Sequence, residues 1–139
     1  MALLSADKWL YVHVPKTGGT SLSHILQKYK CDFLSTHGRL NSQRNLGNKF
    51  VFGFVRNPFT RFASLFYSHI REHGKIPIEQ FIENHQEWDY FFDTQTDWLE
   101  YNGTLDRIDY VGKYENLDSS LKYIFDKIDI EPTTLPYLN

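Results

Sequence analysis

Residues 11–22, YVHVPKTGGTSL, constrain the fold of this chain more than any other stretch. A short apolar run leads into Pro15 and Lys16, then into two glycines, two hydroxyl residues and a helical pattern. Glycines let a backbone wrap closely round an oxyanion, and the N–H groups and dipole of a following helix attract negative charge. The stretch therefore predicts a strand, an anion-binding loop and a helix. A Walker-type loop places its lysine after the glycines, whereas Lys16 precedes them.

The remaining sequence predicts strands that alternate with helices in a single domain, residues 1–139. The expected strands are 9–14, 31–34, 50–55 and 108–114, and the expected helices are 21–29, 58–73, 76–85, 93–101 and 116–128. Residues 50–55, FVFGFV, form a continuous apolar run of the kind found in parallel strands covered on both faces. We therefore expect an α/β fold with a central parallel sheet flanked by helices, and binding loops at the carboxyl ends of its strands.

Composition limits the class of protein. The chain has 139 residues, of which 41% are apolar and 17% aromatic, which suits one domain with a real core. No apolar run reaches the length of about 18 residues that a membrane span needs. The N-terminus lacks a basic region and a cleavage site, so we expect a cytoplasmic protein. The lone Cys31 is expected to be a small buried hydrophobe, and no metal is expected.

The charge is unevenly distributed along the chain. Residues 1–75 carry eleven Lys and Arg against three Asp and Glu, a net charge of +8, whereas residues 76–139 carry −10. Either one folded domain mixes the two sets, or the first half attracts a polyanion. A nucleic-acid partner is not expected, because the excess charge is local and no nucleic-acid motif is present.

A second polar constellation follows the predicted central strand. Arg56 ends that strand, and Ser64 lies eight residues later on the next helix. Arg61, Ser64 and Ser68 share the helix face opposite Phe59, Phe62 and Phe66. A guanidinium and a hydroxyl can thus converge beside the first loop. The two anion pockets would suit a nucleoside that carries phosphates at both ends.

These segments resemble the sulfotransferases. PKTGGTSL resembles their 5′-phosphosulfate loop, FVRNPFTRFASLFY their 3′-phosphate strand and helix, and DYVGKYENLDSSL their later strand and helix. LPYLN resembles a segment of the carbohydrate branch, which includes heparan sulfate 2-O-sulfotransferase. The resemblance implies a P-loop-like sulfotransferase fold and the donor 3′-phosphoadenosine 5′-phosphosulfate (PAPS), with adenosine 3′,5′-bisphosphate as product. The implied acceptor is a hydroxyl, expected on a carbohydrate.

The resemblance also implies roles for individual residues. Lys16 would lie near the bridging oxygen between phosphorus and sulfur, and Arg56 and Ser64 would hold the 3′-phosphate. His37 would be the base that takes the acceptor proton, with Glu115 or a carboxylate of residues 87–100 as the alternative. The 5′-phosphosulfate would be held by Lys16, Thr17, Gly18, Gly19, Thr20 and Ser21, and the acceptor site would include Gln95 and Trp98.

Two other functions stay open at this point. The chain ends at Asn139, earlier than its relatives usually do, and Tyr137 stands where they often have histidine. A module that binds PAPS or adenosine 3′,5′-bisphosphate without catalysis is therefore an alternative. A P-loop kinase of a small metabolite is less favoured, because no Gly-Lys-Ser/Thr sequence is present. The oligomeric state is not predicted.

Overall fold

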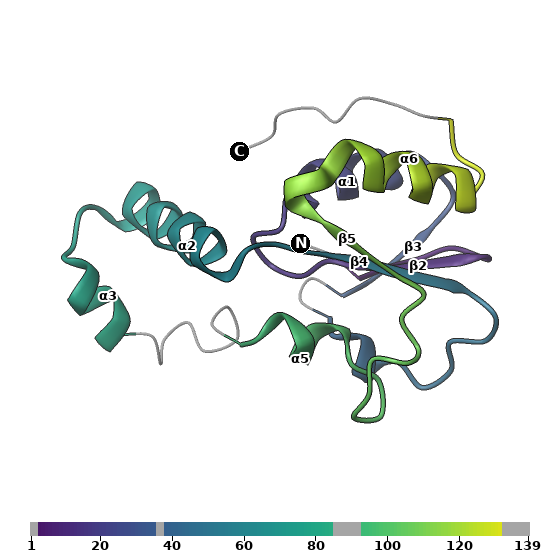
Figure 1. The fold of residues 1–139 in the computed structure, drawn as a ribbon, viewed down its shortest axis with the longest axis horizontal. Coiled ribbons are helices and arrows are strands. Elements are labelled where there is room, and N and C mark those ends of the chain that lie inside the picture. The colour runs from purple at the N-terminus through teal and green to yellow at the C-terminus, as the bar shows by residue number, and fades with distance from the viewer. Residues whose placement is uncertain (1–2, 36–37, 85–92, 132–139) are drawn as a thin grey trace.

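The computed structural model describes residues 3–35, 38–84 and 93–131, which form an α/β fold around a five-stranded sheet (Figure 1). Its strand order is β3-β1-β2-β4-β5. The strands are β1 (Leu3–Ser5), β2 (Trp9–Val12), β3 (Asp32–Ser35), β4 (Phe50–Val55) and β5 (Tyr110–Lys113).

The sheet is mixed, with one reversed strand. β2, β4 and β5 pair in parallel, whereas β1 is antiparallel to both β2 and β3, so β3 runs in the same direction as β2. The predicted central parallel sheet is therefore confirmed, and β1 adds an antiparallel strand that was not predicted. Strand β1 escaped prediction because three residues are too short to show a pattern. A tight turn, closed by the Ala6 N–H to the Trp9 carbonyl at 2.9 Å, folds it back onto β2.

The helices follow the predicted order. They are α1 (Gly19–Leu26), α2 (Pro58–His73), α3 (Ile78–Glu83), α5 (Gln95–Leu99) and α6 (Leu117–Lys127), with 3₁₀ turns η1 (Leu40–Ser42) and η3 (Tyr114–Asn116). Helices α3, α5 and α6 are shorter than predicted, and α1 begins and ends earlier than predicted. Helix α2 matches its prediction at both ends. The Asn57 carboxamide accepts from the N–H groups of Phe59 and Thr60, and Gly74 ends the helix with a φ of 91°.

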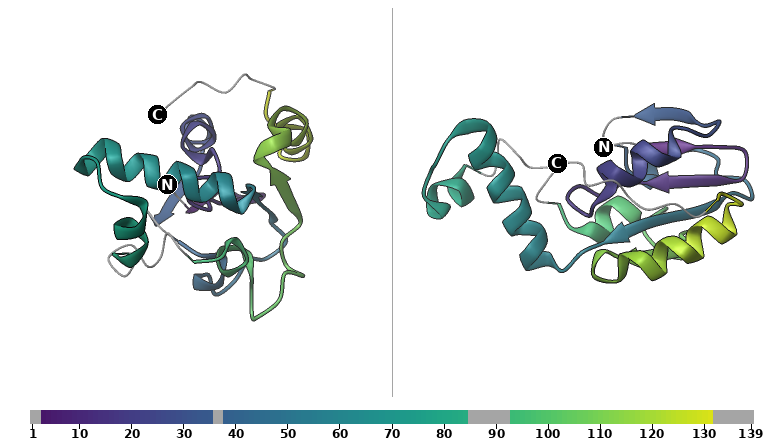
Figure 2. Two further views of the ribbon diagram at one scale, coloured as in Figure 1. Left: turned by 60° about the vertical axis from the view of Figure 1, so that its left-hand side comes forward. Right: turned by 90° about the horizontal axis from the view of Figure 1, so that it is seen from above.

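Helices α1 and α6 cover one face of the sheet, and α5 covers the other (Figures 1 and 2). Each face has its own apolar layer. Leu22 of α1 and Phe125 of α6 pack with Tyr11 and Phe52, whereas Trp98 and Leu99 of α5 pack with the opposite side chains of β2 and β4. Helices α2 and α3 instead project beyond the carboxyl ends of the parallel strands (Figure 1). This arrangement places α2 beside the loop that follows β2.

Candidate functional site

The loop between β2 and α1 adopts an unusual backbone. Lys16 has a φ of 65° and Gly18, the N-cap of α1, has a φ of 82°, both in the left-handed region. Few side-chain-bearing residues adopt this region. The first N–H groups of an α-helix have no carbonyl acceptor within the helix itself. The loop therefore ends at a helix terminus that attracts anions.

Both glycines of the loop are required, for different reasons. Gly18 needs its left-handed backbone and lies against the ring of Tyr114, 3.0 Å from where a Cβ would stand. At Gly19 a Cβ would lie 2.1 Å from the His13 ring and 2.6 Å from the Tyr11 hydroxyl. His13 and Tyr11 are both buried, and their rings stack at 5.9 Å. The two side chains thus pack against Gly19 at the start of α1.

Four polar side chains lie in the loop and in the first turn of α1: those of Lys16, Thr17, Thr20 and Ser21. The Lys16 ammonium donates to the hydroxyl of Ser68 on α2. Burial, followed by the charge of Arg71, lowers the pKa of Lys16. Thr17 is buried and donates its hydroxyl proton to the Val14 carbonyl at 2.8 Å, so that proton serves the loop itself. Thr20 is exposed and Ser21 half-exposed in the first turn of α1.

Arg56 follows β4 and lies beside the loop. Its Nη1 atom is 3.4 Å from the Lys16 carbonyl, and its guanidinium carbon lies 4.1 Å from the centre of the Tyr114 ring. Its Nε atom is buried and has no hydrogen-bond partner within the described parts of the chain. The loop after β2 and the residue after β4 lie side by side because the two strands are parallel neighbours, with Val12 opposite Gly53. Ser64 is half-buried on α2.

Helix α2 turns a polar face to the loop. Arg61 donates from Nε to the Pro15 carbonyl at 2.9 Å and from Nη1 to the Asp93 carbonyl at 3.2 Å. Burial lowers the pKa of Arg61. The predicted aromatic face is present in part: Phe62 and Phe66 pack against Phe81 of α3 at 5.8 and 5.1 Å. Phe59, predicted on the same helix face, does not share this burial. This side chain is 84% exposed, because the first turn of α2 lies beyond the sheet.

The two residues proposed for the acceptor site have other contacts here. The Gln95 carboxamide accepts from the Arg56 N–H at 2.7 Å and donates to the Arg56 carbonyl at 2.8 Å. Trp98 is 1% exposed in the apolar layer under α5, with the Arg39 guanidinium 5.1 Å from its ring. The burial of Trp98 is that of a core residue, so the geometry gives no support to an acceptor contact at either position.

The candidates for the base that takes the acceptor proton differ in what the structure describes of them. His37 lies outside the described residues, so its role stays a prediction. Glu115, in η3, is exposed and accepts from the Asn57 N–H at 2.6 Å, and this bond lowers the pKa of its carboxyl. Its carboxylate therefore supports the start of α2. Of the carboxylates in residues 87–100, Asp93 pairs with Arg39 and Asp97 caps α5.

Two contributors were not identified from the sequence. Tyr114 joins Gly18 to Arg56, and Tyr11 supports Gly19. Tyr114 lies in the later motif DYVGKYENLDSSL, which was the available signal.

Cys31, expected to be buried, is half-buried with its thiol 3.6 Å from the Leu26 carbonyl, and burial raises the pKa of this thiol.

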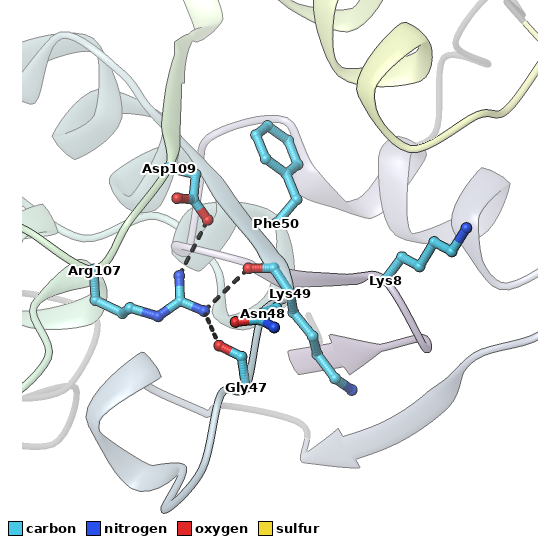
Figure 3. Close-up of a pocket in the computed structure, with 7 residues that line it drawn as sticks. All are labelled: Lys8, Gly47, Asn48, Lys49, Phe50, Arg107 and Asp109. Atoms are coloured by element: carbon cyan, nitrogen blue, oxygen red, sulfur yellow. Dashed lines mark hydrogen bonds and ion pairs between the residues drawn. The ribbon is translucent and has the colours of Figure 1, made fainter.

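A separate hollow of about 490 Å³ lies where β4 and β5 begin, at the end of the sheet away from the loop (Figure 3). Arg107 lines this hollow. Its guanidinium donates to the carbonyls of Gly47 and Lys49, each at 3.0 Å, and to the Asp109 carboxylate at 3.1 Å. Asp109 also accepts from the Val51 N–H at 2.7 Å. This network joins the segments that enter the two strands, so Arg107 and Asp109 are engaged in structure.

The described ranges contain no candidate metal site and no candidate membrane span. Residues 3–35, 38–84 and 93–131 contain no group of three or more His, Cys, Asp or Glu placed to hold a metal ion. Within the same ranges no helix has the length and apolar character needed to cross a bilayer. The cytoplasmic location stays a prediction.

Comparison with known proteins identifies the family. A family model described as "Sulfotransferase family" matches residues 4–137. No curated protein and no solved structure shows significant similarity to the chain. The match includes both strand ends that form the site, and the mixed α/β sheet with its flanking helices is consistent with the sulfotransferase fold. The chain therefore belongs to the sulfotransferase family, whose chemistry is sulfuryl transfer.

Proposed function

We propose that this protein transfers a sulfuryl group from PAPS to a hydroxyl of an acceptor, and that the acceptor is a carbohydrate. One observation carries the proposal: Arg56 lies beside Lys16, with 3.4 Å between its Nη1 atom and the Lys16 carbonyl. Two cationic residues that follow neighbouring strands thus lie side by side. A donor that carries anionic groups at both the 3′ and 5′ positions of a nucleoside needs such a pair.

Several features of the loop fit PAPS. The left-handed Gly18 and the closely packed Gly19 shape the backbone at the start of α1, where an anion is favoured. The buried Nε atom of Arg56 has no partner among the described residues, and a buried cationic N–H is costly unless an acceptor reaches it. An anionic oxygen of the donor would supply that acceptor. We assign Arg56 and Ser64 to the 3′-phosphate and residues 16–21 to the 5′-phosphosulfate.

PAPS supplies the sulfuryl group and its leaving phosphate when bound. Sulfuryl transfer, like phosphoryl transfer, needs in-line positioning and stabilisation of charge on the leaving oxygen. The Lys16 ammonium and the N–H groups at the start of α1 would neutralise that charge. Burial is the main cause that lowers the pKa of Lys16, and the positive charges of Arg71 and Arg56 lower it further; a bound anion would relieve the repulsion from these two arginines.

The acceptor side of the reaction requires a base. We propose His37, which would take the proton of the acceptor hydroxyl. Glu115 is the weaker candidate, because its carboxylate is already bonded to the Asn57 N–H. The carbohydrate acceptor is supported by the resemblance of residues 135–139, LPYLN, to the carbohydrate branch.

Calorimetry with adenosine 3′,5′-bisphosphate and AMP tests the donor. We expect micromolar-range affinity for the bisphosphate, a rise in melting temperature because the ligand binds only the folded state, and weaker binding of AMP. Equal affinity for both ligands would remove the Arg56 pocket. Turnover is tested with labelled PAPS and a panel of glycan and small hydroxyl acceptors. Binding without turnover on any acceptor would favour the non-catalytic module, and activity that needs ATP and a metal would favour the kinase.

A further inference from the structure

The donor loop is tied to the segment that starts α5 through two arginines. Arg61 donates to the Pro15 carbonyl at 2.9 Å and to the Asp93 carbonyl at 3.2 Å. Arg56 reaches the Lys16 carbonyl at 3.4 Å, and its own peptide groups are held on both sides by Gln95, at 2.7 and 2.8 Å. Two successive loop carbonyls are thus linked to two positions of residues 93–95.

These links fix the orientation of two peptide groups in the loop. A carbonyl turned toward a bound anion would repel it unless a cation lies against that carbonyl. Arg61 and Arg56 donate to the carbonyls of Pro15 and Lys16, so each of the two carbonyls is paired with a guanidinium group. Lys16 also has a left-handed backbone, with a φ of 65°, and such a conformation persists only where its surroundings enforce it.

The segment at the other end of these links is well anchored. Thr94 and Asp97 form a capping box at the start of α5, with bonds of 3.3 and 3.2 Å. Asp93 pairs through its carboxylate with Arg39. Trp98, which follows in α5, is buried in the apolar layer beneath the sheet. The start of α5 is therefore fixed to the core, and it can hold the two arginines in place.

We propose that Gln95 and Arg61 are positioning residues for the donor loop, and that Gln95 does not contact the acceptor. This inference rests on the proposed donor site, because it gives that site its rigidity. Gln95 acts through the peptide groups of Arg56, and Arg61 acts through the Pro15 carbonyl. Loss of either side chain should therefore loosen residues 16–19 and weaken donor binding, while the affinity for the acceptor is retained.

The test compares Gln95→Met, which keeps side-chain length, and Arg61→Met, which keeps the apolar stem, with Gln80→Met on the exposed surface of α3 as control. Both test variants lose the polar bonds. Backbone ¹⁵N relaxation of the ligand-free proteins reports the loop directly. We expect order parameters of residues 16–19 to fall from about 0.85 toward about 0.6 in both variants and to stay unchanged in the control. The affinity for adenosine 3′,5′-bisphosphate should fall about tenfold, because a loop that is less ordered before binding must lose more conformational freedom when the ligand binds.

Steady-state kinetics with the best acceptor separates positioning from contact. A positioning role predicts a higher KM for PAPS with an unchanged KM for the acceptor. A rigid loop and unchanged bisphosphate affinity in Gln95→Met, with a raised acceptor KM, would overturn the proposal. Gln95→Glu is the conservative variant: it keeps an acceptor for the Arg56 N–H and loses the donor to the Arg56 carbonyl, so an intermediate effect is expected.

Failure of the positioning role gives a different result from failure of the proposed donor site. If the wild-type protein does not bind the bisphosphate, the donor site is wrong, and the relaxation comparison alone decides whether Gln95 and Arg61 hold the loop. If the wild-type protein binds it and the variants bind equally well with rigid loops, the donor site stands and the positioning role is wrong.

Discussion

The ammonium of Lys16 donates a hydrogen bond to the hydroxyl of Ser68 on α2, 52 residues further along the chain. Ser68 is 9% exposed and also accepts from the Arg71 guanidinium at 3.1 Å. The proposed catalytic lysine is therefore held by the helix that follows β4. Helix α2 thus contributes to the proposed donor site through its polar face, and Arg56 lies just before its start.

Replacement of Lys16 by alanine should abolish most of the turnover. We expect a loss of at least about a hundredfold, the order observed when one oxyanion-stabilising group is removed. The melting temperature should change little, because Lys16 lies in a loop. Lys75→Ala, on the exposed surface after α2, is the matched control. A turnover close to that of the control would exclude Lys16 as the group that stabilises the leaving oxygen.

Replacement of Ser68 by alanine should change the pH dependence of donor binding. Burial and Arg71 already lower the pKa of Lys16, and loss of the Ser68 acceptor should lower it further. Lys16 loses its positive charge as pH rises through its pKa, so affinity for adenosine 3′,5′-bisphosphate should decline at a lower pH in Ser68→Ala than in wild type. Calorimetry across the alkaline range measures this, with the exposed Ser119→Ala as control. Coincident alkaline limbs would show that Ser68 does not stabilise the ammonium.

Gly19→Ala should destabilise the fold by about 1–3 kcal/mol, as overpacking of a core does. The new methyl group would lie 2.1 Å from the His13 ring. A second change, His13→Ala, removes that ring, so the double variant should recover part of the loss. Urea unfolding of the two single variants and the double variant gives the coupling energy. Additive losses would mean that His13 is not the obstacle at Gly19.

The elements that sequence patterns predicted well are those with local signals. Helix α2 has an asparagine cap, a proline in its first turn and a terminal glycine, and β4 is a continuous apolar run. The strand β1 and the exposure of Phe59 depend on segments that are distant in the sequence and close in space. No local sequence pattern reveals such neighbours. In the candidate site, Lys16 and Arg56 follow strands and could be placed together, whereas Gln95 reaches Arg56 across 39 residues without a motif.

The last prediction concerns His37, proposed as the base that takes the acceptor proton. A general base contributes roughly 10²–10⁴-fold, so His37→Ala should reduce kcat by that order. Affinity for adenosine 3′,5′-bisphosphate should remain that of wild type, because the histidine is assigned to the acceptor side. The wild-type rate should decline as pH falls through about 6–7, the range usual for histidine. The alternative base Glu115 would give a different profile: the Asn57 N–H holds the pKa of its carboxyl below the ordinary value of 4.5, so the acid limb would lie lower still. Full turnover of His37→Ala with the best acceptor would transfer the role to a carboxylate, and Glu115→Gln would then identify whether it is this one.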